Sequence, residues 1–98
     1  MFDKMKALLD MQKKMQEVKK QLESAIFESE SANGMVIITM NGSQEVKAVK
    51  IQGDLKDMEQ SALEHAIKDS LSKAIKKSQV VAAEKMKAVT GLNLPGIA

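Results

Sequence analysis

The sequence predicts a small α+β protein in which an N-terminal helix and a long C-terminal helix flank a three-stranded antiparallel sheet, in the order α-β-β-β-α. Three observations support this prediction. Apolar residues recur with a helical period at both ends of the chain, the middle contains short apolar and β-branched runs, and two Asn-Gly steps separate those runs. The 98 residues suit one domain, residues 1–98, without internal repeats. A domain of this size buries little surface alone, so we expect a dimer.

The first predicted helix extends from Asp3 to about Ser24. Its apolar residues fall on two positions of a heptad, the first with Met1, Leu8, Met15 and Leu22 and the second with Met11, Val18 and Ala25. Lys4 interrupts the second series, and the repeat is short. The pattern therefore predicts an amphipathic helix and not a long independent coiled coil.

The predicted hairpins turn at Asn33-Gly34 and Asn41-Gly42, because Asn and Gly tolerate the positive φ of tight turns. They separate the run at Ile26-Phe27 from those at Met35 to Met40 and Val46 to Ile51. The central run is apolar on both faces, so each face needs a cover. One cover is the protein's own helix, and a second copy is the simplest candidate for the other. The predicted dimer interface comprises Met35, Val36, Ile37, Ile38 and Met40.

The second predicted helix begins after Gly53, with Asp54 as its N-cap, and ends at Gly91 as its C-cap. A helix of about 33 residues is long for a globular domain, so we expect a bend or break between Ser78 and Ala83, where small residues gather. Residues 91–98, which include Pro95, are expected to form a mobile tail.

Charge divides the chain into three parts. Residues 1–20 carry six lysines and three acids, residues 21–67 three lysines and eight acids, and residues 68–98 six lysines and two acids. A chain with basic ends and an acidic middle suits the binding of a polyanion. Two solvated helices that need charge for solubility would give the same pattern, so charge alone leaves both interpretations open.

Lysines on both predicted helices are candidates for DNA contact. In the first helix, Lys6, Lys13 and Lys20 repeat every seven residues and can follow a phosphate backbone. Alternatively, Asp10 and Glu17 could pair with these lysines, although such surface pairs contribute only about 0.3–0.5 kcal/mol each. All basic residues are lysines, and the absence of arginine favours phosphate contacts over base recognition. The candidate DNA-binding residues are Lys6, Lys13, Lys14, Lys19, Lys20, Lys73, Lys76 and Lys77.

Several classes of function are not supported. The chain has no cysteine and one histidine, His65, without the partners of a zinc site or catalytic triad. Its glycines are isolated, and its two aromatic residues, Phe2 and Phe27, offer no platform for base stacking. We therefore expect neither an enzyme nor a cofactor, metal or small-molecule substrate. No signal peptide or membrane-spanning run is recognisable, so we expect a cytoplasmic protein.

Several segments together resemble the YbaB/EbfC family of bacterial nucleoid-associated proteins. They are the opening Met5-Lys-Ala-Leu-Leu-Asp-Met-Gln-Lys-Lys-Met-Gln16, the hairpin Asn33-Gly-Met-Val36, the turn Asn41-Gly42 and the closing Gly91-Leu-Asn-Leu-Pro-Gly96. The resemblance implies a tweezer-like cytoplasmic homodimer at the nucleoid. It also implies binding of double-stranded DNA with little sequence preference, for chromosome organisation or gene regulation. One departure is Gln52-Gly-Asp-Leu55, where many relatives have an Asp-Pro step.

Two other hypotheses remain open from the sequence. In the first, the protein is a dimeric structural or adaptor protein that grips a partner protein with its Met-rich first helix. In the second, that helix lies on a membrane surface, because its apolar residues and its lysines face different ways.

Overall fold

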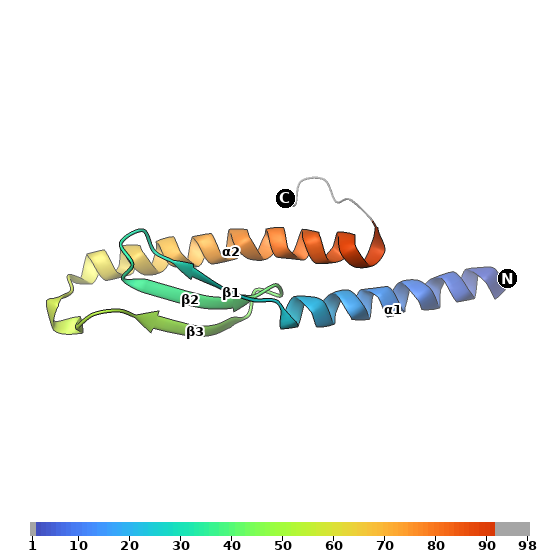
Figure 1. Ribbon diagram of the computed structural model, residues 1–98, viewed down its shortest axis with the longest axis horizontal. Coiled ribbons are helices and arrows are strands. Elements are labelled where there is room, and N and C mark those ends of the chain that lie inside the picture. The colour runs from blue at the N-terminus through green and yellow to red at the C-terminus, as the bar shows by residue number, and fades with distance from the viewer. Residues whose placement is uncertain (1, 92–98) are drawn as a thin grey trace.

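The computed structural model describes residues 2–91 and has the expected order of elements (Figure 1). These are α1 (Phe2–Ser24), β1 (Ile26–Glu30), β2 (Val36–Asn41), β3 (Val46–Ile51), a 3₁₀ helix η1 (Leu55–Asp57) and α2 (Gln60–Thr90). The molecule measures 67 × 23 × 16 Å, with a radius of gyration of 18.1 Å. A compact domain of this length would have a radius of gyration of about 13 Å. The α+β prediction is confirmed, and the fold is strongly elongated.

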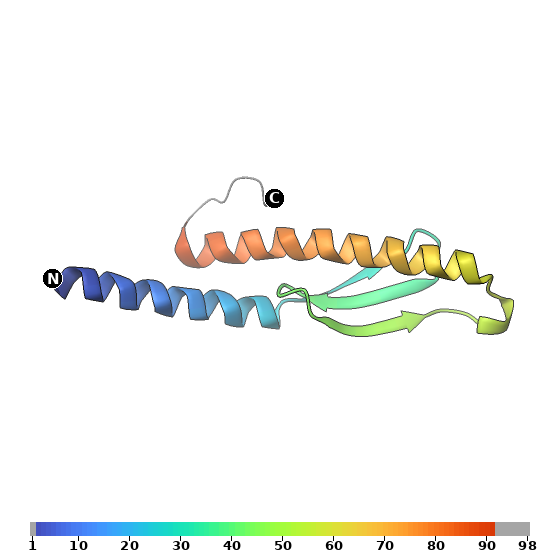
Figure 2. The same cartoon turned by 180° about the vertical axis from the view of Figure 1, so that it is seen from behind.

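The elongation comes from the placement of the two helices. The first half of α2 lies on the sheet, and its second half runs antiparallel to α1, which continues beyond the end of the sheet (Figures 1 and 2). In both views the N-terminal end of α1 extends past the end of α2. A helix of 23 residues is about 34 Å long at 1.5 Å per residue, so α1 forms a projecting arm.

The sheet has the order β1-β2-β3 with antiparallel neighbours, and Ile38 pairs with Ser29 and Val49. The alternate residues Val36, Ile38 and Met40 are at most 2% exposed and form the core with Ala66 and Ala74 of α2. Three of the five residues predicted at a dimer interface are therefore covered by α2 of the same chain. Met35 and Ile37 remain partly exposed.

β3 has no such cover. A helix is about 10 Å wide and strands lie about 4.8 Å apart, so one helix covers about two strands. α2 contacts β1 and β2, whereas every residue of β3 is exposed. Apolar residues remain exposed on β3 and on α2. We call this set the β3–α2 patch, and it comprises Val46, Val49, Ile51, Ile67 and Ile75.

The start of α2 differs from the prediction. Asp54 accepts a hydrogen bond from the Lys56 N–H and caps η1, and the backbone is extended again at Met58. α2 begins two residues later with Glu59 at its N-cap, without a side-chain capping bond. The prediction that Asp54 caps the second helix was therefore wrong, because a separate helical turn comes between them.

The rest of α2 tests two further predictions. The helix runs unbroken from Gln60 to Thr90, so of the bend or break considered between Ser78 and Ala83, the break does not occur. Ser78 is fully buried, and its Oγ donates to the Ile75 carbonyl, so it supports close packing within a continuous helix. Gly91 ends the helix as predicted, with a φ of 73° and an N–H that donates to the Lys87 carbonyl. The rest of the predicted mobile tail, residues 92–98, lies outside the described residues.

Candidate nucleic-acid interface

The C-terminus of α1 is fixed by the turn between β2 and β3. The Gly42 N–H donates to the carbonyl oxygens of Leu22 at 2.9 Å and Ala25 at 3.1 Å. The Asn41 Nδ2 donates to the Glu23 carbonyl at 3.2 Å. The last carbonyl groups of a helix lack partners within the helix, so these bonds cap α1 and set the direction in which it projects.

Both residues of the Asn41-Gly42 step are specialised for this contact. Asn41 is fully buried, and its Oδ1 accepts from the N–H groups of Ser43 and Glu45. A Cβ at Gly42 would lie only 3.1 Å from the Leu22 carbonyl oxygen. The sequence indicated a tight turn here but not an anchor for α1, because an Asn-Gly pattern does not reveal what packs against it.

The lysines predicted on α1 are all exposed. These are Lys6, Lys13, Lys14, Lys19 and Lys20. In residues 2–91, none of them forms an ion pair with a carboxylate, and Glu17 instead accepts from Gln21. The alternative in which Asp10 and Glu17 neutralise the lysines is therefore not realised. With 1.5 Å per residue, Lys6, Lys13 and Lys20 form a line of charge about 21 Å long.

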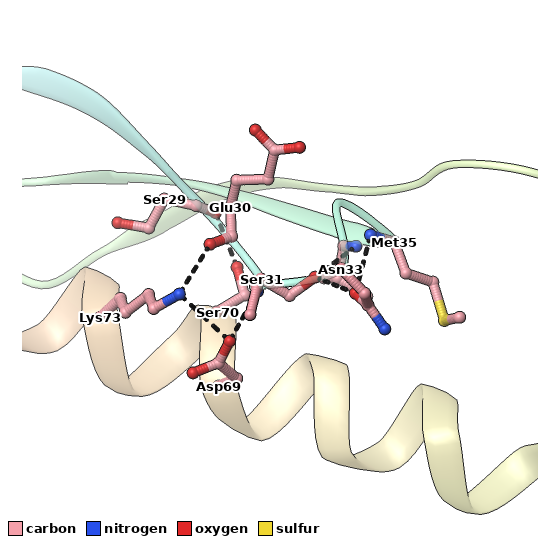
Figure 3. Close-up of polar contacts among 10 residues, drawn as sticks. Ser29, Glu30, Ser31, Asn33, Met35, Asp69, Ser70 and Lys73 are labelled. Carbon is pink, nitrogen blue, oxygen red and sulfur yellow. Dashed lines mark hydrogen bonds and ion pairs between the residues drawn. The ribbon is translucent and has the colours of Figure 1, made fainter.

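Two of the three lysines predicted on α2 have a different environment. The Lys73 Nζ lies 3.2 Å from Asp69 Oδ2 and 3.4 Å from the Glu30 carbonyl oxygen (Figure 3). The Lys77 Nζ lies 3.4 Å from the Glu28 carbonyl oxygen and 5.5 Å from the centre of the Phe27 ring. The Lys76 side chain is exposed and makes no hydrogen bond or ion pair with another described residue.

Lys73 and Lys77 belong to a set of side chains on α2 that covers the edge of β1, which we call the β1 clasp. Asp69 accepts from the Ala32 N–H at 2.8 Å, and Ser70 Oγ donates to the Ser29 carbonyl at 2.6 Å (Figure 3). Free backbone groups on an edge strand can pair with other chains, so their occupation protects the sheet. The β1 clasp consists of Asp69, Ser70, Lys73 and Lys77, and sequence reasoning missed it because its acceptors are backbone atoms.

The clasp also changes the acidity of Asp69. The Ala32 N–H bond, followed by the interaction with Lys73, lowers the pKa of Asp69 below its ordinary value, because both favour the ionised carboxylate. The pKa of Glu45, in the turn that caps α1, is also below its ordinary value. The hydrogen bond from Asn41, then the charge of Lys47, lower it. Both carboxylates are therefore stabilised in their charged form by contacts within the fold.

His65 lies on the exposed side of α2 beside a small cavity of about 250 Å³. Ser31, Ala32, Asn33, Ala66 and Asp69 complete its lining. Within residues 2–91, no group of three or more His, Cys, Asp or Glu side chains could hold a metal ion. No helix of this part of the chain is long and apolar enough to cross a membrane.

Comparison with known proteins identifies the family. The sequence pattern of the YbaB/EbfC DNA-binding family matches residues 1–93. The chain belongs to this family. It is a family of DNA-binding proteins and not of enzymes, so the family assignment and the prediction that the chain is no enzyme are both confirmed.

Individual YbaB/EbfC relatives cover nearly the whole chain. A nucleoid-associated protein of Legionella pneumophila (strain Corby) is 39% identical over 92 residues, 93% of this chain and 82% of the relative. One from Dictyoglomus turgidum is 36% identical over 96 residues, 96% of this chain and 92% of the relative. The crystal structure of the uncharacterized protein HP0035 from Helicobacter pylori is similar, with a TM-score of 0.70 and 25% identity, over 82% of this chain and 86% of that one.

Proposed function

We propose that this protein is a nucleoid-associated protein that binds double-stranded DNA mainly through the phosphate backbone, with little sequence preference, in chromosome organisation or gene regulation. The observation that supports this proposal most directly is the row of unpaired lysines on the projecting helix α1. The names of its relatives support the nucleoid location.

The chemistry of α1 suits phosphate more than bases. Lysine is a mobile point charge, whereas bidentate recognition of guanine is chiefly a property of arginine, which this chain lacks. The length of α1, about 34 Å, is close to one turn of duplex DNA. Phosphate contacts place a protein on DNA without reading its sequence, which accounts for the weak sequence preference that we propose.

The proposal includes a homodimer in which each copy covers the β3–α2 patch of the other. A second copy can place its α2 over β3 of the first copy, and the relation is reciprocal because both copies carry the same helix and the same uncovered strand. Pairing of the two β3 edges is less favourable, because Lys47 and Lys50 and the irregular register opposite Thr39 and Met40 oppose it. Two arms would then project from one dimer, as in a tweezer.

The DNA-binding proposal is tested by titrating the purified protein with two duplexes of unrelated sequence at several salt concentrations. If a dimer contacts roughly six phosphates, the slope of log K against log salt is about −5. We expect similar affinities for the two duplexes and a steep loss of affinity as salt rises. Absence of binding at low salt, or binding that salt does not weaken, would contradict the proposal.

The dimer is tested by sedimentation equilibrium of Val49→Glu. Val49 is 55% exposed in the β3–α2 patch, so a charge there would oppose association without disturbing the core of one chain. Leu55→Glu is the matched control, because Leu55 is 62% exposed on η1, outside the patch. We expect a dimer for the wild type and the control and a monomer for Val49→Glu. A wild-type monomer, or an equal effect of both variants, would exclude this interface.

A further inference from the structure

The two Asn-Gly steps of the chain have the same sequence but different surroundings. Asn33-Gly34 lies in the turn between β1 and β2, at the end of the sheet that faces away from α1 (Figures 1 and 2). Asn41-Gly42 lies at the opposite end and caps α1. Both residues of this second step are buried, whereas Asn33 is exposed and Gly34 is partly exposed. The fold therefore places one chemical group in two environments.

An Asn-Gly step can react with itself without a catalyst. The Gly backbone nitrogen attacks the Asn Cγ, so that a new N–Cγ bond forms and the Cγ–Nδ2 bond breaks. The Nδ2 group takes up the proton of the Gly N–H and leaves as ammonia, and a cyclic succinimide remains. Water then opens the ring to aspartate or to isoaspartate, in which the main chain passes through the former side chain. Glycine favours this reaction because it has no Cβ to hinder the approach of its nitrogen.

The turn at Asn33 leaves the reacting groups accessible. The Met35 N–H donates to Asn33 Oδ1 at 3.0 Å, so the Asn33 side chain is folded back over the peptide group of Gly34 (Figure 3). Within residues 2–91, Asn33 Nδ2 donates no hydrogen bond, so the leaving group gives up no partner when it departs. The Gly34 N–H donates to the Ser31 carbonyl at 2.9 Å, and this bond must open before the attack.

The buried step is held in an unreactive state. Asn41 Nδ2 donates to the Glu23 carbonyl at 3.2 Å and to Glu45 Oε1 at 2.8 Å. The Gly42 N–H is also engaged, because it donates to the carbonyl oxygens that it caps at the end of α1. The leaving group and the attacking nitrogen are therefore both bound. Reaction at Asn41 requires local unfolding of this turn, and the free energy of that opening lowers the rate.

The fold requires both residues of the exposed step. Gly34 has a φ of 72°, and a Cβ there would lie 2.9 Å from Glu30 Oε1, so any other residue would be strained. Asn33 Oδ1 accepts from Ser31 Oγ at 2.7 Å, and Ser31 Oγ accepts from the Val36 N–H at 3.1 Å. These hydrogen bonds connect the turn to the first residue of β2. The reactive step is thus a consequence of the geometry of the turn.

We propose that Asn33 is a site of spontaneous deamidation in the folded protein, and that isoaspartate formed there loosens the turn between β1 and β2. Aspartate keeps an oxygen in the place of Oδ1 and retains the turn. Isoaspartate lengthens the main chain by a methylene group and displaces the carboxylate, so the bonds from Ser31 Oγ and the Met35 N–H are lost. Asn41 is protected by the fold. The modification does not depend on DNA binding.

The experiment compares the two steps by peptide mass spectrometry. The purified full chain is kept in warm, mildly alkaline buffer for several weeks, with and without guanidinium chloride. Trypsin cleaves after Lys20 and Lys47, so residues 21–47 form one peptide that contains both steps, and its fragmentation assigns the modification to Asn33 or Asn41. We expect Asn33 to react about tenfold faster than Asn41, or more, in the folded chain, and the two rates to be nearly equal in the unfolded chain.

Thermal unfolding measures the consequence for the fold. The aged wild type should contain a fraction that melts roughly 6 °C below the fresh protein, since two hydrogen bonds are lost. Aged Asn33→Gln should melt like fresh Asn33→Gln, because Gln forms the corresponding ring far more slowly. Fresh Asn33→Asp should melt within about 3 °C of the fresh wild type, because aspartate retains the acceptor.

Three results would overturn the proposal. The first is an equal rate at Asn33 and Asn41 in the folded chain, and the second is an unmodified Asn33 in a folded chain whose unfolded form reacts. The third is an equal loss of stability on ageing in the wild type and in Asn33→Gln, which would assign the loss to another site.

Discussion

The two helices of this protein carry lysines in similar numbers, but the fold uses those lysines differently. α1 is attached to the sheet at its end, where Asn41 and Gly42 cap its last carbonyls, and its lysines remain unpaired. α2 lies along the sheet, and Lys73 and Lys77 are bound to the backbone of β1. The difference shows that the role of a lysine depends on the acceptors within its reach and not on local charge density.

The largest effect on stability is expected where α1 is attached. Asn41→Asp keeps the shape of the side chain but replaces the Nδ2 donor with an oxygen facing the Glu23 carbonyl and the Glu45 carboxylate. Loss of such buried bonds should lower the free energy of unfolding by about 3 kcal/mol. Urea unfolding measures this change.

Asn33→Asp is the control for this substitution. Asn33 is exposed, and its Oδ1 only accepts hydrogen bonds, from Ser31 Oγ and the Met35 N–H, so a carboxylate can replace it. Its effect should stay below about 0.5 kcal/mol. Equal losses in the two variants would mean that Asn41 does not anchor α1.

The next largest effect concerns the lysines of the two helices, which should contribute differently to the free energy of unfolding. Lys73→Met with Lys77→Met removes two donors from the β1 clasp and should lower the free energy of unfolding by about 1 kcal/mol. Lys13→Met with Lys20→Met, on exposed positions without partners, should change it by less than about 0.3 kcal/mol. Thermal unfolding compares the two pairs, and a greater loss in the α1 pair would reverse the comparison.

Acid should weaken the β1 clasp. The pKa of Asp69 is lower in the folded chain than in the unfolded chain, so its contribution is present above the unfolded pKa, about 4, and is lost as pH falls through the folded value. The wild type should therefore lose more stability than Asp69→Asn between pH 6 and strongly acidic solution. Parallel pH profiles of the melting temperature in the two proteins would contradict this role.

The smallest effect concerns the turn between β2 and β3, which caps α1. Gln44 has a φ of 63°, a conformation that costs L-residues energy and glycine little. Gln44→Gly should raise the free energy of unfolding by about 0.5 kcal/mol, after the greater flexibility of glycine in the unfolded chain is included. Ser43→Gly, at a position without positive φ, should give no such gain in the same urea titration.

The sequence predicted the elements of the fold better than the contacts between them. Periodicity and the Asn-Gly steps located both helices and all three strands, and Gly91 marked the end of α2. The same patterns could not reveal that α2 covers only two strands, because this depends on the width of a helix relative to the sheet. Apolar β2 residues were therefore predicted at a dimer interface, although three of them are covered by α2.

In the candidate site, too, the sequence predicted the position of side chains better than their contacts. The seven-residue spacing of Lys6, Lys13 and Lys20 correctly predicted one exposed row, since spacing fixes the side of a helix. Charge density placed Lys73 and Lys77 in the same class as these lysines, but their partners are the carbonyl oxygens of Glu28 and Glu30. Backbone acceptors are present at every residue, so no sequence pattern identifies those that a side chain will meet.

The most direct test of this account is the salt dependence of DNA affinity in two matched triple variants. Lys6→Gln, Lys13→Gln and Lys20→Gln on α1 should move the slope of log K against log salt from about −5 toward zero, because six phosphate contacts of a dimer are lost. Lys73→Gln, Lys76→Gln and Lys77→Gln on α2 should change it by at most about 2, the share of Lys76 in two protomers. A larger change in the α2 variant than in the α1 variant would contradict the account.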